Sequence, residues 1–249
     1  MAMNTTAHAS YAFLTYAALS WFAWQIAPTG AACFWVMFFG IFPDLDGVYW
    51  KLARKGDMDQ NFQHHLHFPT HFPVTYLPVV AAFALSLALG FYPWVFAVPL
   101  VGLYAHMAFD SISCGDGLMW AKIPWKKDQF ARYVNLWSRQ TDGYHGGYWT
   151  ARYKRTIFFK LENVAAAASI VLIAYFSSLT GWDAWSLLSI LGLAGSVAVS
   201  LKRGDPKFEG EPPEGRYADY HQYEPYVKWY RSKYGRDPPR KYDDETGEK

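Results

Sequence analysis

The chain has 249 residues, of which 52% are hydrophobic and 19% aromatic, while only 18% are charged, less than the usual quarter of a soluble domain. The charges are segregated: residues 1–43 and 72–109 contain no Asp, Glu, Lys or Arg, and residues 163–201 contain only Asp183. This pattern excludes an ordinary soluble domain and predicts an integral membrane protein, and the net charge of +2 gives no direct signal for nucleic-acid binding.

Six hydrophobic segments follow one another along the chain, and tight turns join them into three hairpins. The second segment is too short to span alone, because a spanning helix needs about 20 mostly apolar residues. It either continues through Pro43 to Trp50 or stops partway as a half-helix. The predicted fold class is therefore all-α, a polytopic membrane helical bundle. Its hairpins pair residues 11–27 with 31–42, 72–90 with 91–110, and 163–179 with 182–201.

The Lys and Arg residues predict how this bundle is oriented. Of the 23, three lie in residues 51–71, nine in residues 111–162 and eleven from residue 202 onward, and none lies in the hairpin turns. Since cytoplasmic loops are enriched in Lys and Arg, we expect both termini and all basic segments in the cytoplasm. Residues 1–203 would form the membrane domain with a large cytoplasmic loop at 111–162. Residues 204–249 would form an aromatic-rich, partly disordered cytoplasmic tail with unknown protein partners.

Three polar motifs fall at the cytoplasmic ends of the predicted helices. Asp44 and Asp46 follow Pro43 at the end of the second segment, and His106 and Asp110 end the fourth. The third motif, residues 63–73, contains half of the chain's eight histidines, at positions 64, 65, 67 and 71. His8 lies at the same level, just before the first segment. Because the orientation used only Lys and Arg, this convergence independently supports one shared site.

The residue types of these motifs suit a metal ion. His106 and Asp110 are four residues apart, so they share a helical face and can bind one ion together. Asp44 and Asp46 repel each other unless a cation or another partner neutralises them. The alternatives are a His–Asp hydrogen bond between helices, hydrated acids at a helix end, and interfacial imidazoles that bind water. Imidazole and carboxylate ligands together suit zinc, manganese or iron.

Other catalytic motifs are absent from the sequence. It contains no Gly-x-Ser-x-Gly nucleophile elbow, no phosphate-binding P-loop and no Gly-x-Gly-x-x-Gly dinucleotide-binding motif. The His-Glu-x-x-His motif of zinc proteases is also missing. Nucleophilic catalysis by Ser or Cys therefore has no support.

The order of the polar motifs resembles the YdjM-like, LexA-binding inner-membrane metal-dependent hydrolases. The matching positions within residues 1–125 are His8, Pro43-Asp44-Leu45-Asp46, Thr70-His71, Leu103-Tyr104-Ala105-His106 with Asp110, and the turn Cys114-Gly115-Asp116-Gly117 followed by Pro124. The family pattern His-Arg-Gly-x-Thr-His is replaced here by His-His-Leu-His-Phe-Pro-Thr-His, so either His65 or His67 is the equivalent ligand. More remotely, the order is similar to that of zinc-dependent phospholipase C. The second His-x-x-x-Glu motif of those enzymes is absent, which implies fewer metals.

The resemblance implies a multi-pass protein of the inner (plasma) membrane that hydrolyses a substrate with a divalent metal, most simply zinc. We expect the substrate to be a phosphoester, such as a phospholipid, at the cytoplasmic leaflet, with Asp46 as a general base. The alternative is a non-enzymatic membrane scaffold or metal-handling protein. The predicted ligands are His8, Asp44, Asp46, His71, His106 and Asp110, with His65 or His67 in addition.

Overall fold

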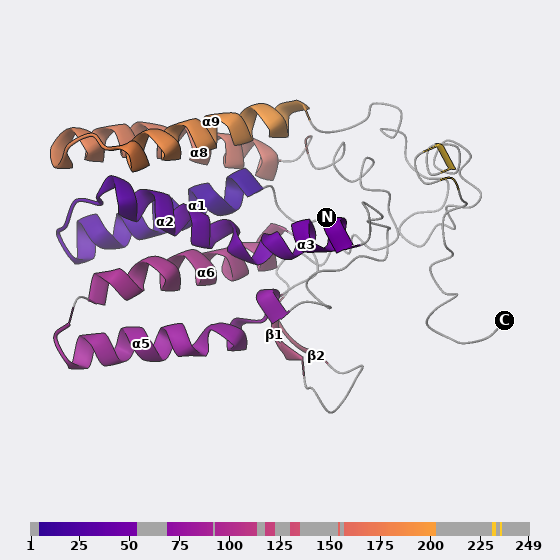
Figure 1. Ribbon diagram of the computed structural model, residues 1–249, viewed down its shortest axis with the longest axis horizontal. Coiled ribbons are helices and arrows are strands. Elements are labelled where there is room, and N and C mark those ends of the chain that lie inside the picture. Colours follow the sequence, from indigo (N-terminus) through magenta and orange to yellow (C-terminus); the bar gives the residue numbers. More distant parts are fainter. Residues whose placement is uncertain are drawn as a thin grey trace.

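Six helical segments lie side by side in the computed structural model of the chain and form three hairpins (Figure 1). The structure describes residues 5–53, 69–91, 93–113, 118–122, 130–134, 154, 157–202, 231–232 and 235. The first hairpin joins α1 (Thr5–Ala18), which continues as the π-helical turn η1 (Leu19–Ala23), to α2 (Gly30–Ile41). The second joins α5 (Leu77–Ala88) to α6 (Pro93–Ser113), and the third joins α8 (Ile157–Thr180) to α9 (Ala184–Lys202).

Three of the described helices are long and apolar enough to cross a membrane: Gly30–Tyr49, Ile157–Thr180 and Ala184–Lys202. A shorter apolar helix covers Pro73–Ala88. These helices confirm the prediction of a helical membrane protein. The prediction that all six segments span the membrane, with both termini in the cytoplasm, remains a prediction.

The second segment does not stop at Pro43. After α2 the chain passes through one 3-10 turn, η2 (Phe42–Asp44), and continues as α3 (Leu45–Ala53). A proline is tolerated there because it begins a new turn, where its missing N–H has no carbonyl to bind. Of the two alternatives that the sequence left open, the continuous helix is the one observed.

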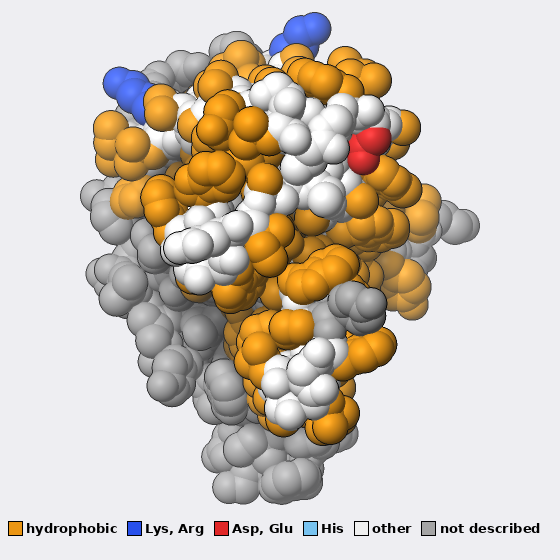
Figure 2. Space-filling model, turned by 90° about the vertical axis from the view of Figure 1, so that its left-hand side faces the viewer, with side chains coloured by type: hydrophobic (Ala, Val, Ile, Leu, Met, Phe, Trp, Pro, Cys, Tyr) orange, Lys and Arg blue, Asp and Glu red, His pale blue; other side chains and the backbone are white. Residues whose placement is uncertain are grey.

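The turns of the three hairpins all lie at one end of the bundle. Thr29 caps α2 there by accepting a hydrogen bond from the backbone N–H of Ala32, and Asp183 caps α9 by accepting from that of Ser186. Figure 2 shows this end of the molecule, where hydrophobic side chains dominate and few charged ones appear. Figure 1 places α3 and the β-strands at the opposite end. Asp44 directly precedes α3, and the turn that carries His71 packs against the turn that carries Asp44.

The centre of the bundle is formed by α1, α2 and α6, which pack on one another. The α8–α9 hairpin covers one side of this group, and α5 covers α6 (Figure 1). Two glycines allow the close approach. A Cβ atom on Gly40 would lie 2.6 Å from the Cβ of Ala12, and one on Gly102 would lie 2.7 Å from the carbonyl oxygen of Val36. Small residues at helix contacts are characteristic of membrane bundles.

The outer faces of α5, α8 and α9 expose many large apolar side chains. Examples are Leu85 (59% exposed), Val171 (66%) and Leu191 (67%). A soluble monomer rarely exposes contiguous apolar surface on this scale. The exposed side chains therefore agree with helices that face lipid.

A two-stranded antiparallel sheet was not predicted. Its strands, β1 (Leu118–Lys122) and β2 (Phe130–Val134), lie within the segment 111–162. The first strand, β1, packs against two 3-10 turns, η3 (Pro69–His71) and η4 (Pro73–Tyr76). The sheet is small and its register irregular, so it leaves little periodic pattern in the sequence. The predicted tail, 204–249, lies outside the described residues except for Arg231, Ser232 and Gly235.

The packing at Gly102 yields a prediction about stability. In Gly102→Ala the new methyl group meets the backbone of α2, so we expect a loss of about 1–3 kcal/mol, as for an overpacked core. Gly192→Ala is the matched control, because none of the described residues comes within 4 Å of a Cβ at that helical position. Thermal unfolding of the purified protein in detergent should show a lower midpoint for Gly102→Ala and an unchanged or higher one for Gly192→Ala. Equal midpoints for the two variants would contradict close packing at Gly102.

Candidate metal centre

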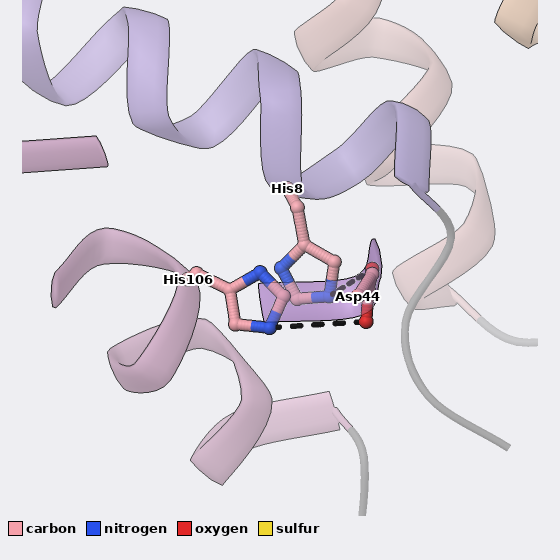
Figure 3. Close-up of side chains that lie close together, drawn as sticks. All are labelled: His8, Asp44 and His106. Carbon is pink, nitrogen blue, oxygen red and sulfur yellow. Dashed lines mark ion pairs between the residues drawn. The ribbon is translucent and has the colours of Figure 1, made fainter. Parts of the chain in front are cut away.

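Five side chains from the first two hairpins meet at the end of the bundle opposite the turns. They belong to His8 on α1, Asp44 on η2, His71 on η3, and His106 and Asp110 on α6. Figure 3 shows His8 and His106 reaching from α1 and α6 toward Asp44. Each of the two histidines has its Nε2 atom 3.9 Å from one of the two Asp44 carboxylate oxygens.

Four of the five side chains are almost fully buried. His8, His71, His106 and Asp110 are each 2% exposed or less. The Asp44 side chain is 16% exposed. Burial of ionisable groups costs free energy unless they are paired or bind a metal. Asp44 is the most exposed of the five side chains and therefore marks the most accessible side of this group.

His106 is held so that one ring nitrogen faces the other four side chains. Its Nδ1 atom lies 2.7 Å from the carbonyl oxygen of Gly40, which can only accept a hydrogen bond, so Nδ1 carries the proton. The Nε2 atom is then free of a proton in the neutral ring. It lies 3.2 Å from Asp110 Oδ2 and 3.4 Å from His71 Nε2. A backbone carbonyl behind a histidine in this way is typical of metal ligands.

His71 is oriented in the same manner by a carboxylate. Its Nδ1 atom lies 2.8 Å from Asp46 Oδ2, and the hydroxyl of Thr70 donates to the same oxygen at 2.9 Å. The Nε2 atom points to the other side, 3.6 Å from Asp44 Oδ1. Burial alone lowers the pKa of His71, but hydrogen bonds with Asp44 and Asp46 and the charges of Asp46 and Asp110 outweigh burial and raise it to about 10. The carboxylates around His71 therefore favour a positive charge at this place. A bound metal cation can supply that charge, as a proton on the ring can.

His8 is positioned by ring stacking. Its ring lies 3.7 Å from that of His106 at an interplanar angle of 19°. Its Nε2 atom is 3.2 Å from Asp110 Oδ1. Neither ring nitrogen of His8 has a hydrogen-bond partner among the described residues. Since buried polar atoms are nearly always satisfied, a cation at Nε2 would satisfy this atom.

The distances between these atoms fit a common ion. Two groups, His8–Asp44–His106 and His71–His106–Asp110, each bring three candidate ligand atoms within 4.8 Å of one another. Zinc binds nitrogen at about 2.0–2.1 Å, so two ligands of a tetrahedral zinc ion lie about 3.3–3.4 Å apart. The distances of 3.2 Å from Asp110 to His106 and 3.4 Å from His71 to His106 are close to that value. The donor set therefore fits a divalent metal.

Both carboxylates turn their two oxygens to different histidines. Asp44 directs Oδ2 to His8 and Oδ1 to His71 and His106. Asp110 directs Oδ1 to His8 and Oδ2 to His106. A metal ion near His71 and His106 would have a carboxylate oxygen as a ligand, and so would a second ion near His8.

The segment that carries His71 is fixed by two tyrosines. Tyr76 donates to the carbonyl oxygen of Thr70 at 2.7 Å, and Tyr104 on α6 donates to that of Pro73 at 3.0 Å. No pattern in the sequence indicated Tyr76 or Gly40. Tyr104 stands two residues before His106, within the motif Leu103-Tyr104-Ala105-His106 that resembles the hydrolase family.

The structure places some of the predicted metal ligands together, one behind His71 and others outside the described residues. The structure brings together His8, Asp44, His71, His106 and Asp110. Asp46 was predicted as a ligand and general base, but its contacts with His71 Nδ1 and Thr70 favour a role in orienting His71. His65 and His67 lie outside the described residues, and the choice between them stays open.

Comparisons of this chain with protein-family models, with curated proteins and with solved structures found no match. The resemblance of its motifs to the YdjM-like hydrolases therefore stays a prediction. What the structure itself supports is a membrane protein with a buried group of His and Asp side chains that could hold a metal ion.

The contact between Asp46 and His71 predicts a change in metal affinity. Asp46→Asn removes the negative charge behind His71, and loss of such an outer partner costs about 10–100-fold in affinity. Asp183→Asn is the matched control, because it lies at the opposite end of the bundle and Asn caps a helix as well as Asp does. Metal content measured across a series of metal-buffered solutions should show weaker binding only for Asp46→Asn. Equal affinities would rule out the orienting role.

Proposed function

We infer that this protein is a membrane-embedded, metal-dependent hydrolase of a phosphoester at the cytoplasmic leaflet of the inner membrane. The observation that carries this inference is the convergence of three imidazoles and two carboxylates, from two hairpins, in one buried group. Buried imidazole and carboxylate without a nucleophilic Ser or Cys motif favour metal-assisted hydrolysis over covalent catalysis.

The positions of basic residues support the cytoplasmic side. Lys51 lies in the last turn of α3, Lys122 ends β1 and Lys202 ends α9, and all three elements end away from the hairpin turns. The metal centre lies toward that same end. Cytoplasmic ends of membrane proteins are enriched in Lys and Arg, so we place the centre and both termini there, with six segments in the membrane.

In this proposal each side chain has a definite task. A bound metal supplies a polarised phosphoryl oxygen and a more acidic water. His71 and His106 would hold it through Nε2, with Asp44 and Asp110 as carboxylate ligands. Asp46 and the Gly40 carbonyl fix the ring orientations. Asp44 is the most exposed of the ligands and is placed to accept a proton from water that enters the site.

The types of donor atom limit which metal and which class of substrate the site would bind. Imidazole with carboxylate suits zinc first, and manganese or iron as well. Asp44, Asp46 and Asp110 bring negative charge that a metal offsets, and an anionic phosphoester is the ligand that such a metal attracts. A phospholipid is the natural phosphoester at a membrane surface.

A carrier for metal ions is the competing function. Transporters hold their ions near the bilayer midplane, between broken helices. Here the described site lies toward one end of the bundle, which favours the hydrolase. A scaffold that binds metal without turnover differs from the hydrolase only in activity, so activity decides between them.

Removal of a ligand should abolish both metal and activity. We expect His106→Ala and Asp110→Ala to lose bound metal and to lower chelator-sensitive phosphoesterase activity by more than about 100-fold, the upper loss for an outer-shell partner. Ser189→Ala, a buried polar residue on α9, is the control and should keep both. Elemental analysis of purified protein and a panel of phosphoesters provide the measurements.

Two results would count against this assignment. Stoichiometric metal retained by both variants would contradict the hypothesis that His106 and Asp110 share one metal site. Metal in the wild type without chelator-sensitive turnover would instead favour the scaffold or metal-handling protein.

The orientation predicts the outcome of reporter fusions. The turn after Thr180 contains Gly181, whose Cβ position is open, so it tolerates an insertion. A reporter that is active only outside the cytoplasm should be active when inserted there and inactive when fused after Lys249. A reporter that is active only inside the cytoplasm should show the reverse. Activity of one reporter at both positions would contradict a membrane crossing by α9.

A further inference from the structure

The helix that follows Asp44 carries an apolar stripe on its outer side. Leu45, Val48, Tyr49 and Leu52 stand at the spacing i, i+3, i+4 and i+7, which places them on one face of α3. They are 40%, 53%, 63% and 75% exposed, respectively. Large apolar side chains exposed together on one face need an apolar partner.

The inner face of the same helix belongs to the metal centre. Asp46, one residue after Leu45, is only 5% exposed and contacts His71. Asp44 precedes the helix directly and faces three histidines. The first turn of α3 therefore lies between the candidate metal ligands and whatever covers the stripe.

Helix length places this turn inside a bilayer. The candidate span Gly30–Tyr49 contains Asp44, Leu45 and Val48. Asp44 lies 14 residues after Gly30, or about 21 Å at 1.5 Å per residue, and Val48 lies about 27 Å from it. The hydrocarbon core is about 30 Å thick, so both residues fall within it if Gly30 lies at its opposite edge.

We propose that the apolar stripe of α3 contacts the acyl chains of the bilayer and holds the metal centre below the level of the lipid headgroups. The stripe continues the surface of a helix that crosses the membrane, and this continuity identifies acyl chains as its occupant. The inference rests on the membrane placement in the proposed function. It implies that the substrate reaches the centre from within the leaflet, as an amphiphile does.

Fluorescent labelling tests where the stripe lies. A cysteine is introduced at Val48, and the native Cys33 and Cys114 are replaced by Ala. Labelled protein is reconstituted into vesicles of phosphatidylcholine and phosphatidylglycerol, with or without nitroxide on the acyl chains. Gly47→Cys is the matched control, because it lies at nearly the same depth, about 100° around the helix from Val48, and no described residue comes within 4 Å of its Cβ position. Leu85→Cys on α5 reports the membrane placement independently.

The expected result is that nitroxide lipids quench the labels at Val48 and Leu85 more than the label at Gly47. Quenching at Leu85 but not at Val48 would overturn this inference and leave the membrane placement intact. Stronger quenching at Val48 by aqueous iodide than by lipid would overturn it in favour of a water-facing stripe. Protection at Val48 from both quenchers would overturn it in favour of a protein contact. Absence of lipid quenching at Leu85 as well would overturn the membrane placement itself.

Discussion

The burial of two carboxylates among three imidazoles, at one end of an apolar bundle, is the constraint on which the structure depends. His8, His106 and Asp110 have almost no exposure, and water cannot stabilise them there. The free-energy cost of burying these groups falls only if each charge faces an opposite charge or shares a proton with its neighbour. The structure meets this requirement by directing Nε2 atoms and carboxylate oxygens toward one another, an arrangement that a divalent cation completes.

This arrangement is possible because the helices approach closely at the same level. The absent side chain of Gly40 lets α1 and α2 meet, with the carbonyl of His8 2.8 Å from where a Cβ would stand. The carbonyl oxygen of Gly40 itself accepts a hydrogen bond from the Nδ1–H of His106. One residue thus sets both the distance between helices and the ring orientation of a ligand, which couples bundle packing to the chemistry of the centre.

Much of the fold could be predicted from the pattern of charge and hydrophobicity. The prediction of a helical membrane protein agrees with three helices that are long and apolar enough to cross a membrane, and the i, i+4 spacing of His106 and Asp110 placed them on one face. The path of the second segment could not be predicted, because Pro43 is compatible with a helix end and with a new turn. Asp46 was assigned by residue type alone, and its contact with His71 depends on how a distant 3-10 turn packs against α3.

The alternation of apolar segments with polar ends, and the gathering of His and Asp residues at those ends, can be read along the chain. Hydrophobic burial in lipid and the segregation of charge are local properties of the sequence. Which atoms face the centre depends instead on tertiary packing. The ligating nitrogen of a histidine is chosen by the hydrogen bond at its other nitrogen, and for His106 that partner is Gly40, 66 residues away.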